Sequence, residues 1–348
     1  MSNAAHTRDG RSARRTFAAG TITALLLGAL VLTAVGSGAS AATSGGTSAD
    51  ARWKFTDDRG NVVNRPSRPV RIVAYETTAA ALFHLGIKPV AIFGSSATPL
   101  SKSSLLAGVN TKGIVSLGAT YGEINLERLA ALKPDLIVTA FNPTFQPLWG
   151  FKDAAQQKKV AGFAPIVAIN GIRAPTTVIG RFKDLARALG ANLKAPRLVA
   201  AQARFTAAVK DLRAATAAKP GLTALALGVY GDGKVYFAKP PDAPALRQYR
   251  QWGLRMVVPG GSGSFWEIVS LEQIDKYPAD LILWDNRPFA LTPEKIGEAT
   301  PTWKLLPAVK AGQLVPWQAQ ESWSYQVYSQ QIRTLANAIK RANANVVP

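Results

Sequence analysis

Residues 195–218 restrict the possible folds of this chain more than any other part of its sequence. They contain a single helix breaker, Pro196, which the first turn of a helix accommodates. Alanine is abundant, and apolar residues recur at steps of three and four positions, as on one face of a helix. The pattern predicts one uninterrupted helix about 33 Å long. This helix divides the chain into a segment before it and a segment after it.

Short apolar runs alternate with helical stretches on both sides of this helix. Continuous apolar runs are typical of parallel strands that helices cover on both faces. The sequence therefore predicts an α/β fold with two doubly wound parallel-sheet lobes, at 53–194 and 219–348, joined by the helix at 195–218. The expected strands are 71–74, 89–93, 135–140, 166–169, 222–230, 235–237, 281–284 and 313–317, with a hairpin at 53–64 and helices at 77–85, 126–132, 244–252, 271–276 and 326–344.

The first 41 residues have the order of an export signal. A basic flank with Arg14 and Arg15 precedes the apolar stretch 17–35, and Ala39-Ser40-Ala41 fits a small-residue cleavage site. We therefore expect a signal peptide at 1–41, a flexible tether at 42–52, and a protein outside the cytoplasm or secreted. A permanent membrane anchor is the alternative for the apolar stretch. The paired arginines resemble a twin-arginine signal, and the export route stays open.

A second cleavage pattern lies slightly upstream. Leu32-Thr33-Ala34 resembles the start of a bacterial lipobox, whose next residue is the cysteine that carries the lipid. That position holds Val35, and the chain has no cysteine. The same absence excludes disulfides, zinc–thiolate sites and cysteine nucleophiles. The chain therefore has no thiol for lipid attachment.

The net charge of +20 suggests an anionic ligand, an anionic envelope polymer, or dispersed solubilising charge. The chain shows no run of five or more basic residues and no nucleic-acid recognition motif, so we expect no nucleic-acid partner.

Two segments, one on each side of the long helix, share the same order of residue types. Residues 125–138 read NLERLAALKPDLIV and residues 270–283 read SLEQIDKYPADLIL. Together with PVRIV at 69–73 and WKLLPAVKAG at 303–312, these segments resemble the iron-siderophore and vitamin B12 family of ABC-importer binding proteins. The resemblance covers the chain from about Trp53 onwards.

This resemblance implies two lobes with a ligand cleft between them and a single bridging helix. It also implies that Glu127 and Glu272, one on each lobe, contact arginines of a membrane permease. Two carboxylates on separate lobes would let the importer sense the distance between the lobes through charge-assisted hydrogen bonds. A solvated helix glutamate, such as Glu127 paired with Arg128, is the alternative.

Ligands of doubly wound sheets bind beyond the carboxyl ends of the strands. Aromatic side chains and an arginine at such positions suit a bulky, oxygen-rich chelate. The candidate ligand-binding residues are Tyr75, Glu76, Phe141, Asn142, Trp149, Tyr230, Tyr236, Trp284, Arg287 and Trp323. We expect the glycine-rich loop 259–264 to be a mobile loop at the rim of the cleft.

Beyond the predicted signal peptide the chain has one histidine, His84. A site for a free transition-metal ion needs several converging ligands, so we expect no metal site and no cofactor. Iron would arrive already chelated.

No nucleophile elbow or catalytic carboxylate pair is recognisable, so we expect no enzyme. The sequence thus predicts a monomeric solute-binding subunit of an ABC importer for ferric siderophores. Cobalamin or haem binding, and a secreted scavenger or sensor without an importer, are the alternatives.

Overall fold

A computed structural model describes residues 52–94, 99–320 and 323–347 of the chain. The predicted signal peptide and the tether, apart from Arg52, lie outside the described residues. Within those ranges, no helix combines the length and the apolar character that a membrane crossing requires. The ranges belong to a single compact unit, which contains two sheets.

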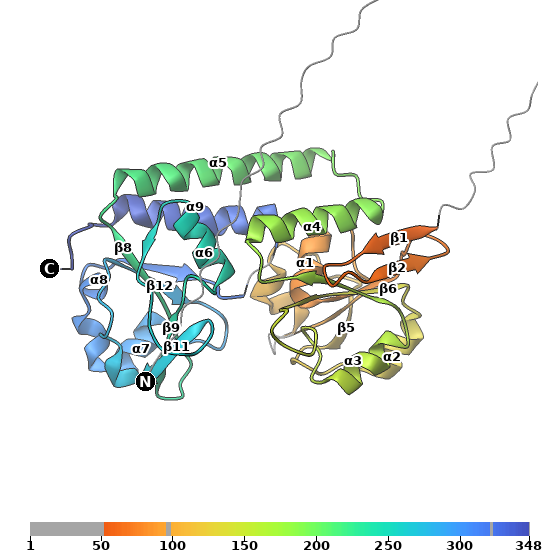
Figure 1. Ribbon diagram of the computed structural model, residues 1–348, viewed down its shortest axis with the longest axis horizontal. Coiled ribbons are helices and arrows are strands. Elements are labelled where there is room, and N and C mark those ends of the chain that lie inside the picture. The colour runs from red at the N-terminus through yellow and green to blue at the C-terminus, as the bar shows by residue number, and fades with distance from the viewer. Residues whose placement is uncertain (1–51, 95–98, 321–322, 348) are drawn as a thin grey trace, which may run out of the picture. The chain divides into compact units, whose positions relative to one another are not determined.

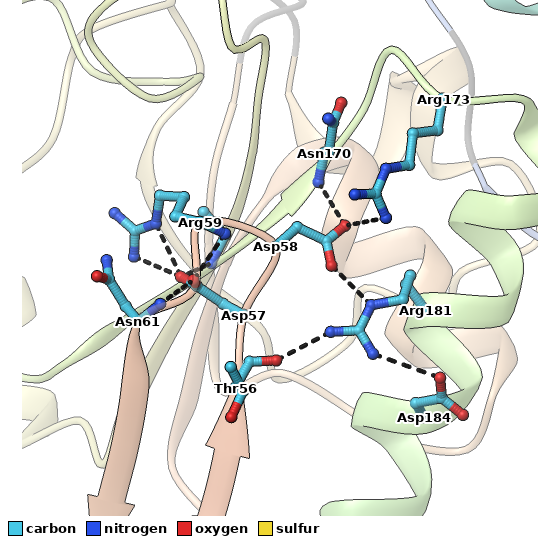
Figure 2. A network of polar contacts seen from close by, with 10 residues as sticks. Thr56, Asp57, Asp58, Arg59, Asn61, Asn170, Arg173, Arg181 and Asp184 are labelled. Atoms are coloured by element: carbon cyan, nitrogen blue, oxygen red, sulfur yellow. Dashed lines mark hydrogen bonds and ion pairs between the residues drawn. The ribbon is translucent and has the colours of Figure 1, made fainter. Parts of the chain in front are cut away.

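The predicted hairpin is present as β1 (Trp53–Thr56) and β2 (Val62–Arg65), which pair antiparallel. Its turn is fixed by Asp57, whose carboxylate accepts hydrogen bonds from the backbone N–H groups of Arg59, Asn61 and Ala168. The next residue, Asp58, faces Arg173 and Arg181 (Figure 2). The hairpin is therefore fastened to the first lobe by buried carboxylates.

The first lobe is built on a five-stranded sheet in the order β5-β4-β3-β6-β7, in which every pair is parallel. Alternate residues of its strands face different clusters: Ile72 and Ala74 pack with α1 and α4, whereas Val73 and Tyr75 pack with α2 and α3. The sheet is thus covered on both faces, as predicted. Its elements are β3 (Ile72–Tyr75), α1 (Glu76–His84), β4 (Ala91–Phe93), η1 (Leu100–Lys102), η2 (Ser104–Leu106), β5 (Val115–Gly118), α2 (Leu126–Leu132), β6 (Leu136–Phe141), α3 (Ala154–Ala161), β7 (Ile166–Asn170) and α4 (Pro175–Ala188).

The long helix predicted at 195–218 is α5 (Pro196–Ala218), with Pro196 in its first turn. Its buried residues follow the predicted spacing and include Leu198, Phe205 and Leu212. It packs along the terminal helix α9 (Tyr325–Arg341), and the two run side by side (Figure 1). Phe205 contacts the rings of Tyr325 and Tyr328, at centroid distances of 5.2 and 5.9 Å. The connection between the lobes is therefore supported by a second helix.

The sheet of the second lobe differs from the predicted parallel sheet, because it is mixed. Its order is β11-β9-β8-β12-β13, with β10 beside β8; β8 is parallel to β10 and β12, but antiparallel to β9. The connection from β8 to β9 spans only residues 230–233, with Gly231 and Gly233 at positive φ. So short a connection joins antiparallel strands, since a parallel pair needs a long crossover. The strands are β8 (Thr223–Val229), β9 (Lys234–Ala238), β10 (Arg255–Met256), β11 (Trp266–Ser270), β12 (Leu281–Asp285) and β13 (Leu314–Trp317).

Helices cover both faces of this sheet as well. One face packs on α5, α9 and α6 (Pro244–Gln251), and the other on α7 (Pro293–Ala299), α8 (Pro307–Lys310) and η4 (Pro301–Leu305). The helix predicted at 271–276 is wrong in length, because only a 3-10 turn, η3 (Leu271–Gln273), forms there. The backbone hydrogen bonds there span three residues, from the Ile274 N–H to the Leu271 carbonyl and from the Lys276 N–H to the Gln273 carbonyl, rather than the four of an α-helix.

Candidate functional site

A cleft of about 410 Å³ lies between the two lobes and is lined by residues from both. In the first lobe it is lined from the end of β3 and the loops after β5, β6 and β7. In the second it is lined from the end of β9, the start of the antiparallel β11, and the segments at the ends of β12 and β13. We call this cavity the cleft. Its lining comprises Tyr75, Tyr121, Asn142, Phe145, Trp149, Gly171, Ile172, Ala238, Ala243, Pro244, Phe265, Trp266, Arg287, Phe289, Trp317, Ala319, Gln320 and Trp323.

Two stacked indoles join the lobes at one side of the cleft. Trp149 and Trp323 lie with ring centroids 5.9 Å apart and planes at 19°. Both rings approach the backbone of Gly171 so closely that a Cβ there would lie 2.8 Å from Trp149 and 3.0 Å from Trp323. Glycine is needed at this position because any side chain would displace the rings. Gln320 adds a polar contact between the lobes by donating a 2.8 Å hydrogen bond to the Tyr75 hydroxyl.

Arg287 supplies the cleft with a cation that is fixed in place. Its guanidinium forms an ion pair with Asp285 at 2.6 Å and donates a 2.8 Å hydrogen bond to the Tyr230 hydroxyl. The Tyr230 hydroxyl in turn donates to Asp285, at 2.8 Å. Phe289 covers the guanidinium, with its ring centroid 4.7 Å from Arg287 Cζ. The arginine is therefore held rigidly at the cleft, with little reorganisation left for ligand binding.

The pKa shifts of this triad agree with its geometry. Burial acts to lower the pKa of Arg287, but the hydrogen bonds and charge of Asp285 outweigh it, and the pKa is raised above its usual value. Burial, followed by the charge of Asp285, raises the pKa of the Tyr230 phenol, against the opposing effect of Arg287. The phenol therefore stays protonated and acts as the donor to Asp285.

The structure brings part of the predicted ligand set together in the cleft: Tyr75, Asn142, Trp149, Arg287 and Trp323. Tyr230 lies behind Arg287, and Tyr236 lies behind Tyr230, with ring centroids 4.7 Å apart.

Five of the ten predicted residues are not brought into the cleft lining: Tyr230 and Tyr236, and also Glu76, Phe141 and Trp284. Glu76 is fully buried in the first turn of α1. Phe141 packs into the core of the first lobe, and Trp284 packs against the core of the second.

Several lining residues were missed by the sequence analysis. Tyr121 follows β5, a strand that the sequence did not reveal. Phe265 and Trp266 follow the glycine-rich loop, whose position at the rim of a cleft was the available signal. The sequence analysis also missed the aromatic residues Phe145, Phe289 and Trp317, together with Gly171, Ile172, Ala238, Ala243, Pro244, Ala319 and Gln320.

Glu127 and Glu272 are both exposed. Glu127 lies in the first turn of α2, and Glu272 lies in η3. Neither makes an ion pair with another described residue; Arg128 instead donates a 3.4 Å hydrogen bond to the Ser116 carbonyl. The local pair of Glu127 with Arg128 is therefore not formed. In the described part of the chain, no group of three or more His, Cys, Asp or Glu side chains is arranged to hold a metal ion.

Comparison with known proteins places this geometry in a family. Residues 72–321 match the profile of the family described as periplasmic binding protein. The chain belongs to the periplasmic binding protein family. The family consists of binding proteins that act outside the cytoplasm. The predicted iron-siderophore and vitamin B12 class within it is confirmed.

Solved structures of such binding proteins resemble this one. The ferric-siderophore receptor DesE from Streptomyces coelicolor is 34% identical, with a TM-score of 0.78, over 84% of this chain and 99% of that one. The petrobactin-binding protein YclQ from Bacillus subtilis is 17% identical, with a TM-score of 0.62, over 83% and 99% of the chains. A siderophore binding protein from the fuscachelin gene cluster of Thermobifida fusca is 23% identical, with a TM-score of 0.55, over 79% and 98%. The latter two show the fold alone. No curated protein sequence matches the chain.

Proposed function

We propose that this protein is the extracytoplasmic solute-binding subunit of an ABC importer, and that it captures a ferric siderophore in the cleft. The observation that carries the proposal is a cleft of about 410 Å³ in which nine of the eighteen lining residues are aromatic and one is a fixed arginine. This volume is within the range of small-molecule sites. Aromatic rings would pack on the organic framework of the chelate, and Arg287 would donate to its metal-bound oxygens.

The similarity to DesE supports this ligand, because that protein is a ferric-siderophore receptor and the two chains align over 99% of its length. In the proposal the iron arrives inside its chelator, so the protein supplies neither metal ligands nor a cofactor and has no catalytic role. Glu127 and Glu272 would meet the permease, and the protein would act as a monomer. Cobalamin and haem are alternative ligands, and a secreted scavenger or sensor is the alternative role.

The proposal is tested by titrating the purified protein with ferric siderophores of the hydroxamate, catecholate and carboxylate classes, and with cobalamin and haem, while following tryptophan fluorescence. Trp149, Trp266, Trp317 and Trp323 line the cleft, so a bound coloured chelate should quench them. We expect saturable quenching by at least one ferric siderophore. Quenching by cobalamin or haem alone would move the assignment to that ligand.

A variant in the cleft and a control variant outside it together show where the ligand binds. Phe289 is 53% exposed and lines the cleft, so Phe289→Ala should weaken binding about three- to tenfold, as loss of one aromatic contact does. Leu305 is 64% exposed and lies outside the lining, so Leu305→Ala should leave the affinity unchanged. Equal affinities for both variants would show that the ligand binds elsewhere.

A further inference from the structure

Phe265 has a backbone conformation that is unfavourable for a residue with a side chain. Its φ is +63°, in the left-handed region that glycine adopts readily and phenylalanine does not. The one other described non-glycine residue with positive φ, Lys133, caps the end of α2, where this conformation is common. Phe265, in contrast, does not lie at the end of a helix. It lies between the glycine-rich loop 259–264 and β11.

Hydrogen bonds on both sides hold Phe265 in this conformation. Its carbonyl accepts a 2.8 Å bond from the Lys239 backbone N–H, and its own N–H donates to Asp242 Oδ2 at 3.3 Å. The Lys239 ammonium donates a 2.6 Å bond to the Gly261 carbonyl and so fixes the preceding loop. Lys239 is 9% exposed. The segment between β9 and α6 therefore determines the position of Phe265.

The side chain that results from this conformation faces the other lobe across the cleft. The rings of Phe265 and Phe145 lie 6.4 Å apart between centroids, with planes at 36°. Phe145 comes from the loop after β6 and is 52% exposed. Both rings line the cleft, and neither is enclosed in a lobe's core. Backbone strain of this kind persists where the surrounding structure enforces it, and functional sites are where it clusters.

We propose that Phe265 is a specificity-determining residue, which pairs with Phe145 to hold the organic framework of the bound chelate between the two lobes. This inference rests on the proposed function. Because one ring comes from each lobe, the pair contacts a ligand fully only when both lobes engage it. The ligands selected are chelates with an apolar alkyl or aromatic surface that both rings can contact.

The test separates a ligand contact from a structural role, because the two predict different results for the same substitution. Glycine and asparagine both tolerate positive φ. Phe265→Gly and Phe265→Asn therefore relieve the backbone strain while removing the ring. We expect each variant to weaken binding of the best ferric siderophore about three- to tenfold, with a thermal unfolding midpoint that is not lowered. A lowered midpoint with unchanged affinity would overturn the proposal.

The partner ring and a control complete the experiment. Phe145→Leu should weaken binding to a similar extent, and Phe145→Leu combined with Phe265→Gly should cost less than the sum of the two, since the rings act as a pair. Phe163, 39% exposed and outside the cleft lining, provides the control variant Phe163→Ala, which should bind as the wild type does. Full additivity would contradict the paired action. If the wild type bound none of the ligands, the proposed function itself would fail; wild-type binding with unaffected variants would refute this inference alone.

Discussion

His84 is enclosed by the first lobe, with 7% of its surface exposed. Burial lowers the pKa of its imidazole below 6.5; hydrogen bonding to the backbone of Gly108 and Ala107 opposes this effect, and the charge of Arg197 adds to it. Nδ1 has no hydrogen-bond partner among the described residues. Protonation would thus place an unsatisfied N–H on a buried cation that the charge of Arg197 also disfavours.

A pH dependence of stability follows from the lowered pKa. The unfolded chain binds a proton at His84 near pH 6.5, whereas the folded chain binds it only at lower pH. Stability is therefore lost as the pH falls below 6.5, by up to about 1.4 kcal/mol for each unit of pKa difference. We expect the unfolding midpoint to fall between pH 7.5 and 5.5, and to fall less in His84→Gln. An imidazole NMR titration of His84, assigned with that variant, should have its midpoint below 6.5; a midpoint at or above 6.5 would contradict this account.

Individual cleft residues were partly predictable from the sequence. The ends of apolar runs mark the edge of a parallel sheet where ligands bind, and this identified Tyr75, Asn142 and Arg287. The position of a residue along a strand does not specify which face of the sheet its side chain lies on. Trp284 was therefore included among the predicted ligand-binding residues, although it packs against the core of the second lobe. Phe265 was missed because its direction depends on a backbone conformation that hydrogen bonds from a distant segment enforce.

At the scale of elements, Asp58 is one of the two buried carboxylates that hold the β1–β2 hairpin. Asp58, 2% exposed at its side chain, accepts a 2.6 Å hydrogen bond from Arg181 Nε in α4 and a 3.0 Å bond from the Asn170 backbone N–H at the end of β7 (Figure 2). Arg173, in the loop after β7, lies 3.5 Å away. The adjacent Ile172 lines the cleft. The same carboxylate therefore fastens both the hairpin and a cleft loop.

Removing that charge should destabilise the protein. Asp58→Asn leaves Arg181 without its buried partner, and we expect the free energy of unfolding to fall by about 1–3 kcal/mol. Asp184 contacts the same Arg181 at 3.4 Å but is 47% exposed, so Asp184→Asn should cost less than about 1 kcal/mol. Urea denaturation of both variants measures the difference. Equal losses would mean that the buried contact is no stronger than the exposed one.

Elements with strong local patterns were predicted well, and those set by their connections were not. The long helix α5 follows from an alanine-rich stretch without interior breakers. The direction of β9 was misjudged because apolar runs predict strands, whereas the length of the link to β8 decides the pairing. The four residues of that link were visible in the sequence and would have indicated an antiparallel pair.

For the whole molecule, delivery of the ligand to the permease is a separate property from binding of the ligand in the cleft. Glu127 and Glu272 are exposed, and neither lines the cleft. The double variant Glu127→Ala with Glu272→Ala should therefore bind the ferric siderophore with unchanged affinity but fail to restore its uptake in cells that lack the wild-type gene. The exposed carboxylates Glu123 and Glu298 provide the control, and their double alanine variant should restore uptake. Loss of binding in the first variant, or normal uptake, would refute the docking role.

The net charge of the whole chain does not predict the charge of the residues that line the cleft. The chain carries a net +20, yet Arg287 is the one charged side chain among the described residues that line the cleft, and Asp285 neutralises it. The early expectation of an anionic ligand thus finds little support there. We expect the dissociation constant to change by less than about threefold between about 0.05 and 0.5 M NaCl, because salt screens exposed charges and not buried pairs. A tenfold loss of affinity would indicate binding through the basic surface.

The central claim is that the cleft captures an intact ferric chelate. Isothermal titration calorimetry tests it most directly, with each ferric siderophore compared against the same siderophore without iron. The account predicts one site per protein for at least one ferric complex, with a dissociation constant below about 10 μM, or about −7 kcal/mol, and weaker binding of the iron-free form. If no ferric siderophore binds more tightly than this limit, the account is wrong.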